Sequence, residues 1–221
     1  MNYPQIALYL IGTAITFYVG HRAYKVVKTE RIFALCIWKR LRIKHFLVAI
    51  GCAYLFVETV ASIYPLHPVF RFSLLSLITG TDASYNVAFS PAILAGESGT
   101  VMAKAFVLAF LSVLAIAMPS LNFEEEQAMR QGKNAWDDVP VQSAVFGMLH
   151  IFAGVPVAVC VALMLVGAVW HIVYKFRYER NLGLGLTGPE AELEAALEST
   201  AYHNAFNNLG LVVLAYFLLW K

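Results

Sequence analysis

Hydrophobic runs separated by short polar stretches fill most of the chain. A helix that crosses a bilayer needs about 20 mostly apolar residues. Six runs approach this length, and we predict that they cross the membrane: residues 6–24, 46–64, 101–118, 139–153, 155–174 and 203–220. Residues 70–96 are less apolar and are interrupted by TGTDASYN and by Pro91, so we expect this segment not to cross.

Prolines and polar residues predict where several helices begin and end. Pro119 follows the third run, so we expect the spanning helix to end there. Asn122 is then expected to cap a short separate helix that ends near Gly132. Pro189 begins a proline-free stretch that reaches the end of the chain and predicts one helix of about 30 residues. The sequence RIFALCIWKR at 31–40 predicts a short helix lying on the membrane surface.

Composition supports a membrane protein. Of the 221 residues, 60% are hydrophobic and 14% are charged, whereas soluble domains contain about 25% charged residues. We therefore predict an all-α polytopic membrane protein, a bundle of about six to seven transmembrane helices. We expect a single membrane domain over 1–221, with N-terminal helices in 1–118. Residues 119–221 then form a core that carries the polar motifs and a charged cytoplasmic segment, 175–200.

The positive charges indicate sidedness. Residues 22–44 hold eight Lys or Arg and one acid, Glu30, and KFRYER at 175–180 adds three cations. Loops rich in Lys and Arg stay in the cytoplasm. Six crossings place both basic segments there, whereas a crossing by 70–96 would place KFRYER outside. The expected surroundings are the lipid bilayer, with no nucleic acid as partner.

The segment NFEEEQAMRQGKNAW at 122–136 is a polar motif between two hydrophobic runs. Glu126 and Arg130 are four residues apart, so on a helix they share a face and can form an ion pair. Glu125 points about 100° away and is free for another role. Taken alone, consecutive glutamates are more typical of the first turn of a helix, where the helix dipole favours acids.

Two further motifs lie in apolar surroundings: Phe146 with His150, and His203 with Asn207. Taken alone, such a histidine is usually a hydrogen-bonded core residue, and Asn207 can hold helices together. With Glu125 in the same cavity, however, these groups offset one another's desolvation cost. They also provide a general base and donors for developing negative charge. We predict one intramembrane polar site that opens to the cytoplasmic side.

Glu58 lies well inside the second predicted span. Ionisable residues at such depth usually face the interior of the bundle. A structural role is the more common one, and Lys104 is a possible partner. The three cysteines are too scattered for a metal motif and are expected to fill apolar space.

The three motifs together resemble those of the CAAX-protease and bacteriocin-processing (CPBP) family, glutamate-dependent intramembrane endopeptidases formerly called ABI. The matching segments are EEQAMRQG at 125–132, SAVFGMLH at 143–150 and HNAFNN at 203–208. The resemblance covers the chain from about residue 119 to its end, and it depends on all three motifs in this order.

The resemblance implies a role for each motif residue. Glu125 is the expected general base that activates a water molecule, with His150 assisting it. Glu126 and Arg130 are the expected supporting pair that orients the site. No cofactor or metal is implied.

The third motif supplies the oxyanion stabilisers, His203 and Asn207, by the same resemblance. Two departures from the family pattern affect the surroundings of the site. Met129 stands where the family usually has an aromatic residue before the arginine, so the packing beneath the glutamates can differ. The segment 175–200 is long and charged, and can form a lid or a docking surface.

The residues leave other chemistries open. The sequence contains no His-Glu-x-x-His motif, which excludes a zinc protease of that type. No Ser-His-Asp or Cys-His arrangement is evident. One carboxylate and two histidines, Glu125, His150 and His203, suit zinc or iron, so a metal site is an alternative.

Three functions fit these observations. The first is an endopeptidase that hydrolyses a peptide bond of a membrane-anchored or lipid-modified protein, located in a prokaryotic inner or plasma membrane. The second is a non-catalytic membrane partner, such as a bacteriocin-immunity or assembly protein. The third is a transporter with a proton relay through Glu58, Glu125 and His150, although the sequence lacks the repeated halves common in transporters.

Overall fold

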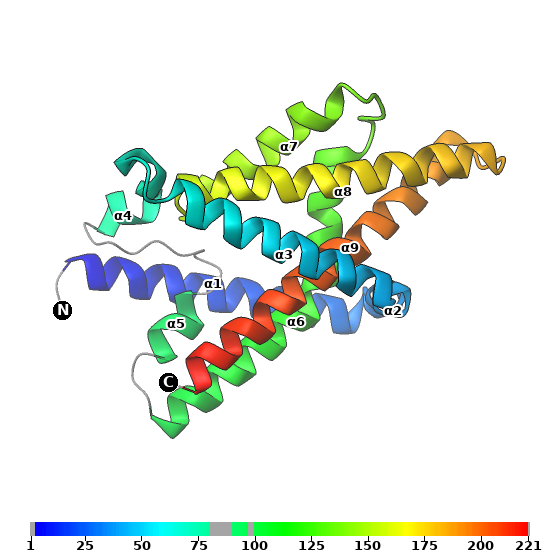
Figure 1. Cartoon of the computed structure of the whole chain (residues 1–221). Helices are drawn as coiled ribbons and strands as arrows, with labels where there is room; N and C mark the ends of the chain where they lie inside the picture. The colour runs from blue at the N-terminus through cyan, green and yellow to red at the C-terminus, as the bar shows by residue number, and fades with distance from the viewer. Residues whose placement is uncertain (1–2, 80–89, 97–99, 221) are drawn as a thin grey trace.

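All regular elements in the part of the chain that the computed structural model describes, residues 3–79, 90–96 and 100–220, are helices (Figure 1). The predicted all-α class is therefore confirmed. In chain order the elements are α1 (Tyr3–Lys28), α2 (Arg31–Arg40), α3 (Ile43–Ile63), η1 (Pro68–Arg71), α4 (Leu74–Thr79), α5 (Ser90–Gly96), α6 (Val101–Arg130), α7 (Asp138–Leu149), η3 (His150–Ala153), α8 (Val157–Gly183) and α9 (Gly188–Leu219).

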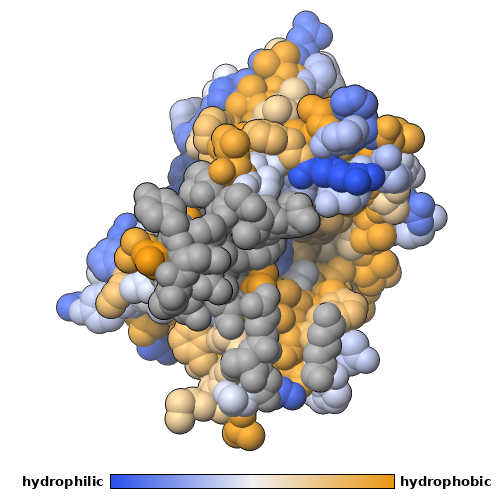
Figure 2. All heavy atoms as spheres, turned by 90° about the vertical axis from the view of Figure 1, so that its left-hand side faces the viewer, coloured by the Kyte–Doolittle hydropathy of each residue, from blue (hydrophilic) through white to orange (hydrophobic). Residues whose placement is uncertain are grey.

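Three helices are long and apolar enough to cross a membrane: α3, α6 and α8. By the length and composition of these helices, the chain is a membrane protein. Large apolar side chains on these helices face outward, for example Leu47 on α3, which is 63% exposed. Figure 2 shows hydrophobic residues over much of the described surface on one face. In lipid this outer surface lies against acyl chains, so its exposure carries no hydrophobic penalty.

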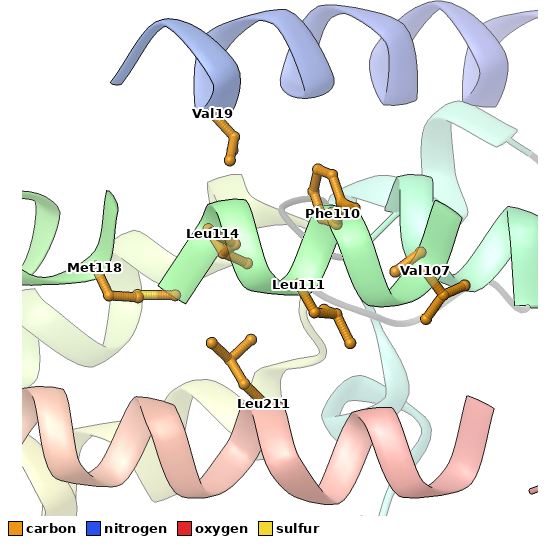
Figure 3. Close-up of a cluster of buried hydrophobic side chains, with 8 residues drawn as sticks. Val19, Val107, Phe110, Leu111, Leu114, Met118 and Leu211 are labelled. Atoms are coloured by element: carbon orange, nitrogen blue, oxygen red, sulfur yellow. The ribbon is translucent and has the colours of Figure 1, made fainter. Parts of the chain in front are cut away.

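The long helices α6 and α9 lie side by side in opposite directions at the centre of the fold (Figure 1). Helix α1 packs on the other side of α6. Figure 3 shows how Val19 of α1, Phe110 and Leu114 of α6, and Leu211 of α9 fill the space between the three helices. These side chains are at most 5% exposed. This apolar cluster packs α6 against α9, next to the stretch of both helices that carries the polar residues.

The prediction that a helix ends at Pro119 is wrong. Pro119 lies inside α6, which continues to Arg130, so Asn122 is a buried interior residue and not a cap. A proline removes one backbone N–H donor, but helices in membranes tolerate this where neighbouring groups satisfy the freed backbone. The predicted end is close to the observed one, since Gly132 adopts a left-handed conformation (φ 74°) two residues after α6.

The prediction that Glu58 faces the bundle interior is also wrong. The buried face of α3 is formed by His45, Ala49 and Cys52, and Glu58 falls on another face and is exposed. The ammonium of Lys104 donates instead to the carbonyl oxygen of Leu219 at 2.8 Å. Glu58 therefore has no place in a relay with the other polar motifs in this structure.

The charged segment 175–200 forms a helical hairpin from the end of α8 and the start of α9 (right of Figure 1). Gly185 makes the turn with φ 88°, a left-handed conformation that glycine adopts without a Cβ clash. The prediction of one long C-terminal helix is confirmed, because α9 has 32 residues. Within 70–96, residues 80–89 lie outside the described residues, and α4 and α5 have six and seven residues.

Candidate active site

Polar residues at four-residue spacing form facing stripes on α6 and α9. Asn122, Glu126 and Arg130 lie on one face of α6, and Ser199, His203 and Asn207 lie on one face of α9. Four residues are about one turn, so each stripe follows its helix axis. Because the helices are antiparallel, Asn122 meets Asn207 and Glu126 meets His203.

Glu126 is the most enclosed acid of the site. Its side chain is fully buried, and its Oε1 lies 2.7 Å from Nη1 of Arg130, itself 1% exposed. Ser199 donates its hydroxyl to Oε2 of Glu126. His203 approaches Oε1 with Nδ1 at 3.0 Å. The predicted Glu126–Arg130 pair is thus confirmed as a contact, and two groups from α9 complete it.

Glu125 points in a different direction, as predicted, and is 32% exposed. Its Oε1 lies 3.7 Å from Nε2 of His150, and its Oε2 lies 3.7 Å from Nε2 of His203. Both separations exceed a direct hydrogen bond and match a polar contact that water can bridge. The carboxylate is therefore the point where the three motifs meet.

The hydrogen bonds of the two imidazoles determine what they present to Glu125. Nδ1 of His150 lies 2.8 Å from the carbonyl oxygen of Phe146, which can only accept, so this nitrogen carries a proton. By the same reasoning Nδ1 of His203 donates to the carboxylate of Glu126. In the neutral state both Nε2 atoms are then acceptors that face another acceptor, Glu125. This arrangement suits a water molecule that donates to these groups.

Aromatic rings hold the two histidines in place. Trp170 of α8 stacks on His203 with ring centroids 4.1 Å apart, and Phe146 of α7 packs edge-on against Trp170. Arg130 lies over the face of Phe146 at 5.6 Å. Gly167 makes room for this ring, since a Cβ there would lie 2.7 Å from it. Phe146 also contacts His150, with ring centroids 4.8 Å apart, so both imidazoles pack against this aromatic cluster.

Asn207 does not reach Glu125 in this structure. Its amide donates to Oδ1 of Asn122 at 2.8 Å, and Asn122 in turn donates to Oδ1 of Asn204 at 3.3 Å. Asn207 therefore lies one turn beyond His203 in a chain of side-chain amides. Its other N–H faces the sulfur of Met118 at 3.8 Å, so neither N–H is directed to the Glu125 carboxylate.

Glu124, the first glutamate of the run, contacts α1. Its Oε1 lies 2.6 Å from Nη2 of Arg22, which also donates to the hydroxyl of Ser120 at 2.6 Å. The three glutamates lie near the C-terminal end of α6, where the helix dipole disfavours acids. The alternative of a helix start is therefore wrong here, and cations or histidines beside each glutamate offset the dipole.

Three residues that were not predicted as site residues complete the site: Ser199, Trp170 and Asn122. Two of them carry a signal in the sequence, because Ser199 is four residues before His203 and Asn122 is four before Glu126. Trp170 carries no such signal, since its position depends on how α8 packs against α9. Met129, which departs from the family pattern, packs in the apolar cluster with Trp170.

A scan against protein-family models, a search of curated proteins and a search of solved structures each found no match to this chain. Among the described residues, no group of three His, Cys, Asp or Glu side chains is arranged to hold a metal ion.

Proposed function

We propose that this chain is an intramembrane endopeptidase in which Glu125 activates a water molecule, as the resemblance to the CPBP family implies. The observation that carries the proposal is the position of Glu125. Its carboxylate is partly accessible and faces Nε2 of both His150 and His203 at 3.7 Å. A water molecule held there could donate to the carboxylate and to one imidazole, which is the geometry that a general base requires.

In the proposed reaction Glu125 removes a proton from water while the water oxygen attacks the carbonyl carbon of the peptide bond. The resulting tetrahedral oxyanion accepts a hydrogen bond from protonated His203. The protonated Glu125 then gives its proton to the leaving amine, the C–N bond breaks, and the carboxylate is restored. The fixed, buried Glu126–Arg130 pair supports this step because it holds Nδ1 of His203 and stabilises the imidazolium.

Asn207 donates to Asn122 and lies one turn beyond His203, so it does not contact the other members of the proposed machinery. We propose that it becomes a second oxyanion donor when substrate is bound and its amide turns toward the reacting carbonyl. Asn207→Ala should then lower kcat by about 100-fold, the usual loss for one such donor. Unchanged turnover by the folded fraction, together with lower stability, would assign Asn207 a structural role only.

We infer the orientation of the chain in the membrane from the two basic segments. Arg40 of α2 pairs with Glu194 of α9 at 3.0 Å, so residues 22–44 and 175–200 meet at one end of the bundle. Six crossings require this common side, and the charge rule makes it the cytoplasm. Cysteines placed at positions 35 and 185 should resist a membrane-impermeant thiol reagent applied to intact cells. Labelling of either position from outside would overturn the proposed orientation.

Glu125→Gln tests the function directly. The purified protein is incubated with a pool of membrane-anchored and lipid-modified peptides, and products are identified by mass spectrometry. We expect the variant to lose at least about 100-fold in cleavage, the usual scale for a general base. Glu124→Gln, one residue away, is the matched control and should cleave normally. Equal cleavage by wild type and Glu125→Gln would remove Glu125 from the mechanism.

The non-catalytic alternative is favoured by a separate observation. The amide chain of Asn122, Asn204 and Asn207 joins α6 to α9 without needing a substrate. If the whole polar stripe serves assembly, wild-type protein will cleave none of the peptides. Loss of a partner from pull-down experiments with Glu125→Gln would then support the assembly function.

A further inference from the structure

A cavity of about 830 Å³ lies at the end of the bundle that carries the charged segments. It is separate from the Glu125 site and is formed by α2, the start of α3, the end of α8 and the start of α9. Its lining residues are Ile32, Leu35, Cys36, Lys39, Arg40, Arg42, Lys44, His45, Arg177, Arg180 and Glu198. Six of these are Lys or Arg and one is an acid, so the cavity is strongly cationic.

Some of these cations are neutralised within the protein. Arg40 forms two bonds of 3.0 Å with Glu194, and Lys44 pairs with Glu198. The acids thus hold the α2–α3 segment against α9. These two pairs fix the walls of the cavity and leave the other cations available.

Four lining cations make no ion pair with any described residue: Lys39, Arg42, Arg177 and Arg180. Nε of Arg177 is buried and has no hydrogen-bond partner in the described part of the chain. An unpaired buried guanidinium donor is costly unless something accepts from it. Four cations line one cavity, three of them exposed, and the fourth has a buried donor without a partner, which indicates a site for an anion.

Part of the lining is apolar and comes from α2, the helix that also contributes Lys39. Ile32 is 87% exposed and Leu35 is 44% exposed, and neighbouring Trp38 is 36% exposed on the same helix. Tryptophan beside exposed aliphatic residues is typical of a helix in the interfacial region of a bilayer. A free inorganic anion would gain nothing from these apolar side chains, whereas a phospholipid has both a charged and an apolar part that match the two kinds of lining residue.

We propose that this cavity binds the phosphate headgroup of an anionic phospholipid. Arg177, Arg180, Lys39 and Arg42 contact the phosphate, and an acyl chain lies along Ile32 and Leu35 of α2. Cationic pockets between helices on the cytoplasmic side suit such headgroups, and each nearby cation contributes about 5-fold in affinity. The proposal is independent of the proposed peptidase activity, because it concerns binding alone.

The test measures lipid binding by the full chain in neutral detergent, with short-chain phosphatidylglycerol as the anionic probe and phosphatidylcholine, whose phosphate is balanced by its own ammonium group, as the zwitterionic counterpart. We expect phosphatidylglycerol to bind more tightly. The double variant Arg177→Gln/Arg180→Gln should weaken that binding by about 25-fold. The control Lys28→Gln/Arg31→Gln removes the same charge from exposed cations outside the cavity and should bind as wild type.

Three outcomes would overturn the proposal. Equal affinity for phosphatidylglycerol and phosphatidylcholine would show that the cavity does not select an anionic headgroup. An equal loss in the control variant would mean that net charge alone attracts the lipid. Inorganic phosphate or an acidic peptide that binds with the same dependence on Arg177 and Arg180, and more tightly than phosphatidylglycerol, would identify a different ligand.

Discussion

The three consecutive glutamates allow one substitution to be compared at three adjacent positions, because each has a different environment. Glu126 is fully buried and contacts Arg130, His203 and Ser199. Glu126→Gln keeps the volume but leaves the Arg130 guanidinium, 1% exposed, without its counter-ion. Removing one partner of a buried pair costs about 3–5 kcal/mol in the free energy of unfolding.

The neighbouring substitutions should behave differently. Glu124 is 53% exposed, so its pair with Arg22 is worth at most about 1 kcal/mol. Glu125 is 32% exposed and forms no direct hydrogen bond with a described residue, so Glu125→Gln should cost little stability while abolishing cleavage. The expected order of destabilisation is Glu126→Gln well above Glu124→Gln and Glu125→Gln.

Unfolding of each purified variant in mixed detergent micelles measures these differences, and the double variant Glu126→Gln/Arg130→Met provides the control. Removing both charges avoids an unpaired ion, so the double variant should regain much of the lost stability. The reasoning fails if Glu126→Gln is as stable as Glu124→Gln. It also fails if Arg130→Met in the Glu126→Gln background adds a further full loss, because the two charges would then be independent.

Three further predictions test packing, charge and chemistry. Gly147→Ala should destabilise the protein by about 1–3 kcal/mol, since its Cβ would lie 2.4 Å from Met164, whereas Gly51→Ala has open space and should be nearly neutral in thermal unfolding. His45 beside Glu198 lowers the pKa of that carboxyl to about 2. The ionised Glu198 carboxylate therefore contributes its full stabilisation above pH ~4.5 and loses it as the pH falls toward ~2. The stability difference between wild type and Glu198→Gln should shrink in acid. Cleavage should survive treatment with EDTA followed by desalting, and activity restored by one specific metal would favour the metalloenzyme alternative.

The sequence predicted those parts of the fold that follow from a local pattern. The hydrophobic runs predicted helices in the right places, and the absence of proline after Pro189 predicted the length of α9. The prediction that a helix ends at Pro119 was wrong because it considered the local sequence alone. Within a bundle, neighbouring helices can stabilise a helix that contains a proline. The prediction that Glu58 is buried was wrong because burial depends on which face of α3 packs inward, and the sequence of α3 alone does not determine that face.

In the candidate site, too, the sequence predicted what helix geometry determines and did not predict what depends on packing between helices. Four-residue spacing predicted the Glu126–Arg130 pair and the separate direction of Glu125, both of which depend on helix geometry alone. The contact of Glu126 with His203 depends on the alignment of two helices far apart in the sequence, which no local pattern specifies. The same holds for Trp170, whose ring is placed by the packing of α8.

The antiparallel alignment of α6 with α9 has a consequence for how the chain can change in length. Inserting one residue within either polar stripe rotates everything beyond it by about 100° and advances it by about 1.5 Å. Glu126 would then lose His203 although every motif residue remained in the sequence. The turn at Gly185 lies outside both stripes, so extra residues there leave the alignment intact. Homologous chains should therefore differ in length at the hairpin and keep fixed spacing within α6 and α9.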